Sequence, residues 1–124
     1  MGKVVVLSLG GVLGTLARYF MSSTVHRAAG PGFPFGTLAV NALGCFLIGF
    51  LGALAEKKAG FGPHMRLMLM VGFCGAFTTF STYIVDTHGL MQDGEMWKDM
   101  ANMVASVVIG FLVFRLGLIL GNLL

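Results

Sequence analysis

The chain has 124 residues, of which 56% are hydrophobic and only 10% are charged. Its mean hydropathy of +0.89 lies far above that of a water-soluble domain. This composition indicates an integral membrane protein with one transmembrane domain, residues 1–124, and excludes a separate soluble catalytic domain. The eight lysines and arginines are scattered, so they predict anchors at the membrane interface and no nucleic-acid partner.

Four apolar stretches are long enough to cross a lipid bilayer, which takes about 20 mainly apolar residues in a helix. The sequence therefore predicts an all-α membrane protein with helices at about 4–24, 36–55, 65–87 and 97–123. The first stretch is too long for a removable signal peptide and lacks a small-residue cleavage site, so it is predicted to be a helix.

The basic residues orient these helices only weakly. Four spans place both termini on one side, and five basic residues fall nearest that side against three on the other. The five are Lys3, Lys57, Lys58, Arg66 and Arg115, and the three are Arg18, Arg27 and Lys98. The positive-inside rule then allows insertion in both orientations, and it equally allows a single orientation with both termini in the cytosol.

Glycines recur at helical spacing along the predicted helices. They are Gly10 and Gly14, then Gly44, Gly49 and Gly52, then Gly117 and Gly121. Small residues let membrane helices approach closely, so this spacing predicts helix packing. A phosphate-binding loop would need a strand before it, which the pattern does not offer.

The links carry turn residues and charges. HRAAGPGFPFG, residues 26–36, is predicted to end the first helix and start the second. THGLMQDGEMWKD, residues 87–99, is predicted to be an interfacial segment with solvated charges and Trp97 as an anchor. The histidines lie in or near links and are expected to be solvated: His26, His64 and His88.

Nothing in the sequence indicates an enzyme. It has no paired carboxylates, no nucleophile with a base and no metal-ligand cluster. Cys45 and Cys74 lie inside apolar stretches, where a free cysteine commonly acts as a small hydrophobe. Neither a disulfide nor a metal is assigned to them.

Asn41 places an amide inside the second helix. Burying such a group without a partner costs on the order of 2–7 kcal/mol, so it must pair with another helix, water or a permeating ion. Hydrogen bonding between helices is one of these alternatives. Thr37 lies four residues earlier and therefore on the same helix face.

The third helix contains a run of glycines and hydroxyls that predicts a break near residues 75–79. The run comprises Gly72, Gly75, Thr78, Thr79, Ser81 and Thr82. Glycine loosens a helix, and Ser and Thr side chains compete for its backbone hydrogen bonds. Carbonyls freed by a break cannot face lipid, so they must be buried, line water or hold an ion.

Phe80 and Tyr83 are three residues apart and share a helix face beside these hydroxyls. The edge of an aromatic ring is positive and can face an anion, although two aromatics at this spacing are also typical of a core or lipid-facing surface. Helices one, two and four have no acidic residue well inside, so hydroxyl and amide donors favour an anion over a proton-coupled cation exporter.

Three segments resemble the Fluc fluoride channels, also called the CrcB family. They are GGVLGTLARYF at residues 10–20, GTLAVNALGCFLIGF at 36–50 and GFCGAFTTFSTY at 72–83. The resemblance covers most of the chain. It implies a dual-topology homodimer in the cell (inner) membrane, with two antiparallel subunits, two fluoride pores and a central sodium ion at the interface.

The resemblance also implies roles for individual residues. Asn41 would donate its amide to fluoride, Phe80 would turn its ring edge to the anion, and Tyr83 would stand where the family usually has a second pore phenylalanine. The other roles concern a hydroxyl track, a sodium site formed by backbone carbonyls, and an arginine in a vestibule or a structural contact. The hydroxyl track would consist of Ser81, Thr82 and Thr37. The sodium site would use the backbone carbonyls of Gly75 and Thr78. Arg18 would lie in the vestibule or make a structural contact.

The fourth helix departs from the family pattern, because it lacks the hydroxyls expected along that pore wall. Ser106 and Asn102 are the nearest substitutes. Arg115 either extends toward the helix end or pairs with another group, or else it points into one pore.

The function implied is passive fluoride export that lowers the cytoplasmic fluoride concentration. Three alternatives stay open. The chain could be one subunit of a heterodimeric fluoride channel with a paralogous partner. It could be a small multidrug-type proton-coupled exporter, although its first helix lacks the acidic residue which that class needs. It could also be a structural membrane subunit without transport.

Overall fold

A computed structural model describes residues 2–57 and 61–124, and these residues form helices and turns without a strand. The elements are α1 (Gly2–Ala29), α2 (Phe35–Lys57), α3 (Pro63–Arg66), η1 (Leu67–Cys74), α4 (Gly75–Phe77), α5 (Phe80–Gln92) and α6 (Met96–Leu123). Elements α3 to α5 form one interrupted span, in which η1 is π-helical. The described residues thus contain four helices long and apolar enough to cross a membrane, and the chain is a multi-pass membrane protein as predicted.

Two helices extend beyond their predicted bounds. α1 continues to Ala29 and α5 to Gln92, so the link before α6 is only residues 93–95. Gly30, with φ +84°, and Gly94, with φ +74°, mark the two ends. Glycine adopts positive φ without steric penalty, so these two glycines end the helices, whereas charged and polar residues earlier in the predicted links remain helical.

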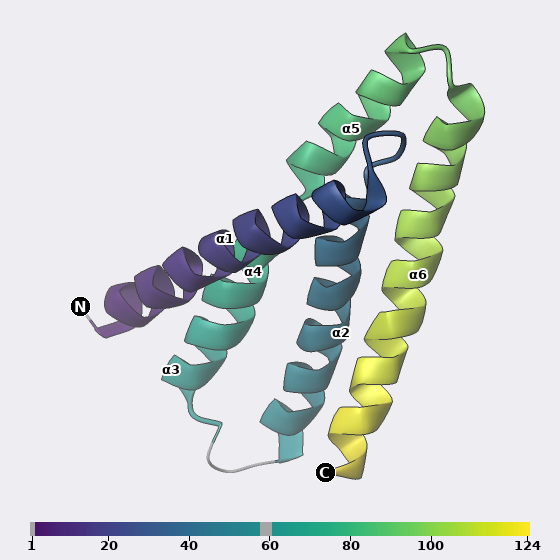
Figure 1. Cartoon of the computed structure of the whole chain (residues 1–124). Coiled ribbons are helices and arrows are strands. Elements are labelled where there is room, and N and C mark those ends of the chain that lie inside the picture. The colour runs from purple at the N-terminus through teal and green to yellow at the C-terminus, as the bar shows by residue number, and fades with distance from the viewer. Residues whose placement is uncertain (1, 58–60) are drawn as a thin grey trace.

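The helices pack through glycines, as their spacing predicted. Figure 1 shows α1 crossing over η1 and α4, while α2 and α6 run side by side. A Cβ added to Gly10 would lie 2.1 Å from the Met68 carbonyl oxygen, and one added to Gly117 would lie 2.2 Å from that of Phe46. Backbone therefore meets backbone in both contacts, and any larger side chain would separate the helices.

Of the charged residues Asp99, Arg18 and Arg115, only Asp99 differs from the sequence-based expectation. Asp99, which was predicted to be solvated, is buried with only 5% of its surface exposed. It lies in the first turn of α6, three residues before the buried Asn102 and therefore on the same helix face. Arg18 is half-buried beside the middle of the third span. Arg115 is exposed on α6 and forms no ion pair with the described residues.

The remaining polar links follow the prediction. His26, His64 and His88 are all exposed, and Trp97 is 71% exposed. Lys58, which entered the count of basic residues, lies outside the described residues.

Candidate functional site

The third span is interrupted at Thr78 and Thr79, within the predicted region. Thr78 has φ −81° and ψ 157°, and Thr79 has φ −150° and ψ 120°, so both are extended. The helix ends at Phe77 and resumes at Phe80. Two consecutive extended residues remove backbone groups from the helical hydrogen-bond ladder, and those groups require other partners.

Asn41 of α2 supplies partners for both backbone groups of Thr79. The Thr79 N–H donates to Asn41 Oδ1 at 2.8 Å, and Asn41 Nδ2 donates to the Thr79 carbonyl at 2.9 Å. In a continuous helix the Thr79 N–H would instead bond the Gly75 carbonyl. The Asn41 amide therefore stabilises the extended break from a neighbouring helix.

Gly44 lets α2 approach the break closely enough for this contact. A Cβ added at Gly44 would lie 2.1 Å from Thr78 Cγ2, which is closer than real Cβ contacts. The position of Asn41 therefore depends on the absence of a side chain at Gly44, one turn later on α2.

Hydroxyl groups at the break form hydrogen bonds with nearby backbone groups. Thr79 Oγ1 accepts from the Thr82 N–H at 3.3 Å and caps α5. Thr78 Oγ1 donates to the Cys74 carbonyl at 2.9 Å. Much of the dense hydroxyl run thus serves the backbone at the ends of two helix segments.

Replacing Thr79 by Val should destabilise the protein by about 0.5–2 kcal/mol, because α5 loses its N-cap acceptor. Thr79→Ser should retain stability, since the hydroxyl remains. Thermal unfolding of both variants in the same detergent measures the difference. Equal unfolding temperatures would show that the cap does not contribute.

A cavity of about 470 Å³ and a neighbouring one of about 280 Å³ lie on the α1 side of the break. Both are lined by Thr37 and Thr82, and Arg18 lines the smaller one. Thr37 Oγ1 donates to Asp86 Oδ2 at 2.5 Å, and Arg18 Nη1 donates to the Thr78 carbonyl at 3.4 Å. This side of the break is a polar vestibule.

A third cavity, of about 340 Å³, is lined by Asn41, Phe80, Tyr83 and Ser106 beside the break. The Phe80 and Tyr83 ring centroids are 5.7 Å apart with planes at 39°. Phe80 is 75% exposed, so the described chain covers little of its ring. An amide, a hydroxyl and two aromatic rings therefore meet at one place on the subunit surface.

The structure divides the residues predicted for one permeation track between these two sides. Asn41, Phe80 and Tyr83 share one cavity, whereas Thr37 and Thr82 line the vestibule cavities. Thr79 lines cavities on both sides of the break. Ser81 is exposed, with its hydroxyl 3.5 Å from that of Thr79.

Sequence reasoning assigned no site role to Thr79 or Asp86. A threonine directly before a helix is a typical N-cap signal, so the local pattern could have identified Thr79. Asp86 was interpreted only as a residue near the end of the third helix. Its contact with Thr37 joins positions 49 residues apart, and no local pattern encodes such a contact.

The carbonyls of Gly75 and Thr78, predicted to hold sodium, both lose a helical donor. The Thr79 N–H goes to Asn41 instead of the Gly75 carbonyl, and the Thr82 N–H goes to Thr79 Oγ1 instead of the Thr78 carbonyl. Oxygen ligands of this kind suit a hard cation. Arg18 shares the Thr78 carbonyl, which has a second lone pair available.

A separate polar cluster joins α5 to α6 and lines none of these three cavities. Asn102 Nδ2 donates to Thr87 Oγ1 at 3.1 Å, and both residues are buried. Asp99 lies one turn before Asn102, and its Oδ1 has no hydrogen-bond partner among the described residues. Of the two proposed helix-four substitutes, Ser106 reaches the cavity and Asn102 connects helices.

Comparison with known proteins covers nearly the whole chain. The family model described as CrcB-like protein, Camphor Resistance (CrcB), matches residues 5–118. A protein of Dehalococcoides mccartyi named fluoride-specific ion channel FluC is 40% identical over 124 residues, which is 100% of this chain and 95% of that protein. The proteins of the same name from Nitratidesulfovibrio vulgaris and Chlorobium luteolum are 42% identical over 123 residues and 44% identical over 117 residues. These alignments cover 99% of both chains in the first case, and 94% of this chain and 90% of the relative in the second. The chain belongs to the CrcB family.

Proposed function

We propose that this chain forms a fluoride-selective channel that lets fluoride leave the cell passively. The chain aligns over nearly the full length of relatives that are named fluoride-specific ion channels. The observation that carries the proposal is the cavity where the Asn41 amide, the Ser106 hydroxyl and the rings of Phe80 and Tyr83 meet. It is a transport site and not an enzyme active site.

The chemistry of this cavity suits a small, strongly hydrated anion. Asn41 has two N–H groups on Nδ2, of which one donates to Thr79, so the second is available to an ion. Hydroxyl and amide donors replace lost water, and the positive edges of aromatic rings favour negative charge. The residues that line the cavity carry no carboxylate that would repel an anion.

A second subunit would complete the pore. Phe80 is 75% exposed, although a ring that contacts a permeating ion should be shielded from lipid. An antiparallel copy of the chain in the cell (inner) membrane would cover this face and create two equivalent pores. The weak bias of the basic residues supports insertion in both orientations. A paralogous subunit could take the same position.

Sodium would be held at the interface by the carbonyls of Gly75 and Thr78, which the break frees from helical donors. The bound ion would supply a fixed positive charge beside the break. Arg18 Nη1 donates to the same Thr78 carbonyl. These contacts would stiffen the segment that Asn41 also supports.

Efflux from liposomes that contain only this purified protein tests the proposal. We expect rapid fluoride efflux without chloride efflux. Phe80→Ala should reduce fluoride efflux by about two- to tenfold, if the contact of a ring edge with the anion is similar in size to that within an aromatic pair, about 0.5–1.5 kcal/mol. Phe111→Ala is the matched control, because Phe111 is 62% exposed on α6 and lines no cavity described above.

The other outcomes separate the alternatives. A folded protein that is silent alone but conducts with a paralogous subunit would indicate a heterodimer. Loss of dimer assembly in Phe80→Ala, without any flux from the wild type, would indicate a structural subunit. Equal fluoride and chloride efflux would contradict fluoride selectivity.

A further inference from the structure

Both cysteines of the chain line the same small cavity. Cys45 lies on α2 and Cys74 ends η1, so 29 residues of sequence separate them. A cavity of about 170 Å³ between these helices is nevertheless lined by both. Both thiols are free.

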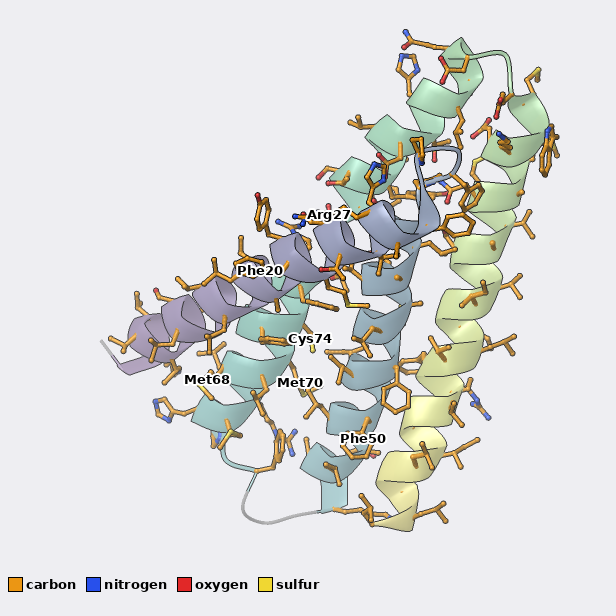
Figure 2. The ribbon with its side chains drawn as sticks, viewed as in Figure 1. Phe20, Arg27, Phe50, Met68, Met70 and Cys74 are labelled. Atoms are coloured by element: carbon orange, nitrogen blue, oxygen red, sulfur yellow. The ribbon has the colours of Figure 1, made fainter. Side chains whose placement is uncertain are left out.

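The thioether of Met70 also lies at this cavity. Met70 lines the same cavity and precedes Cys74 by four residues, so the two share a face of η1. Figure 2 shows Met70 and Cys74 on the side of η1 that faces α2. The methyl carbon of Met70 lies 3.8 Å from a Cβ built at Gly52 of α2, so its side chain spans the gap.

The rest of the cavity wall is uncharged and mostly apolar. Its remaining residues are Gly44, Ile48, Gly75 and Thr78. Among the described residues no carboxylate or imidazole lines it, which disfavours hard divalent cations, although Gly75 and Thr78 are the residues whose carbonyls are proposed above to hold sodium. Thiolate and thioether ligands select soft cations, above all monovalent copper and its chemical analogue silver.

We infer that Cys45, Cys74 and Met70 form a binding site for a soft monovalent cation, of the Cu⁺ and Ag⁺ class, between α2 and η1. As the two sulfur–metal bonds form, each thiol releases its proton to water, and neither the metal nor the sulfur changes oxidation state. The Met70 sulfur is a neutral third ligand. The Cys45 sulfur lies beside Gly110 of α6, 3.4 Å from a Cβ built there, so binding the metal requires this thiol to turn from α6 toward the cavity.

Cysteine and methionine are also common packing residues, and that alternative makes a different prediction. Three sulfurs that only fill space would bind silver independently and weakly, if they bind it at all. A chelating site binds one ion through several sulfurs at once. The difference is measurable without any transport assay, so this inference does not depend on the proposed channel function.

The test uses the purified full-length protein, reduced and in a chloride-free nitrate buffer, titrated with Ag⁺. Equilibrium dialysis with elemental analysis gives the stoichiometry, and a pH-stat gives the protons released. We expect one Ag⁺ per chain and two protons per Ag⁺. Cys45→Ser and Cys74→Ser should each release one proton and lose at least about 100-fold in affinity, because losing a ligand exceeds the 10–100-fold effect of an outer-shell partner.

Met70→Leu should weaken silver binding by less than either cysteine change, because the Met70 sulfur is a neutral ligand, and should leave two protons released. Met103→Leu is the matched control, because Met103 is 40% exposed on α6 and away from the cavity. Elution volume and helical circular dichroism confirm that each variant is folded, and Cys45→Ala replaces Cys45→Ser if the latter is not. Wild-type affinity in a cysteine variant, two Ag⁺ per chain with one proton each, or no binding would each overturn the inference.

Discussion

Asn41→Ala will strongly reduce fluoride efflux and destabilise the protein more than any other single side-chain truncation at the break. The change leaves the N–H and the carbonyl of Thr79 without their partners. Each buried unpaired group costs about 1–3 kcal/mol, so we expect a loss of about 2–6 kcal/mol in the free energy of unfolding. Thermal unfolding in detergent and efflux from liposomes measure the two effects.

The loss of fluoride efflux in Asn41→Ala can be estimated separately from the loss of stability. A hydrogen bond to a charged group contributes about 1.5–3 kcal/mol, so losing the Asn41 donor should slow fluoride by about 10–100-fold even in folded protein. Asn102→Ala is the control, because Asn102 is also buried and also bonds a threonine of another helix, away from the cavity. It should lose stability and keep efflux per folded protein. Equal loss of efflux in both variants would mean that Asn41 acts only between helices.

Gly44→Ala will separate α2 from the break, and Thr78→Ser in the same chain will restore the contact. The new Cβ would lie 2.1 Å from Thr78 Cγ2, and the serine removes that methyl group while keeping the hydroxyl that bonds the Cys74 carbonyl. Overpacking of this kind costs about 1–3 kcal/mol. We expect efflux and stability to fall together in the single variant and to recover together in the double variant.

Gly52→Ala is the control for this pair. Gly52 lies on the same helix, but its added Cβ would meet only the end of Met70, at 3.8 Å. This is an ordinary contact, so efflux should be unchanged. Failure of Thr78→Ser to rescue Gly44→Ala would show that the clash with Cγ2 does not position Asn41.

Local composition explains why several features follow directly from the sequence. The apolar stretches require membrane-spanning helices, because no other structure satisfies the backbone in lipid except a closed barrel. Glycines at Gly10, Gly14 and Gly117 predict close helix contacts from spacing alone, and the structure confirms them. The hydroxyl run predicts the break, which is found at Thr78 and Thr79.

The site itself depends on relations that local composition does not encode. Asn41 needed a partner, but only the placement of α2 against the third span identifies that partner as the backbone of Thr79. The predicted hydroxyl track is divided because Phe80 and Tyr83 share one face of α5 and line the cavity with Ser106, whereas Thr82 lies on another face of α5 and lines the vestibule. Helical periodicity separates these two faces, but only the placement of the other helices around α5 shows which cavity each face lines.

By itself, then, the sequence determined the membrane class, the four helical spans, the glycine contacts and the broken third span, because each follows from residues close together in the chain. Only the tertiary structure decided the burial of Asp99, the contact between Thr37 and Asp86, and the placement of Cys45 and Cys74 at one cavity. Each of these depends on how one helix is rotated and shifted against another. That arrangement depends on packing contacts along whole helices, and no short segment of sequence determines it.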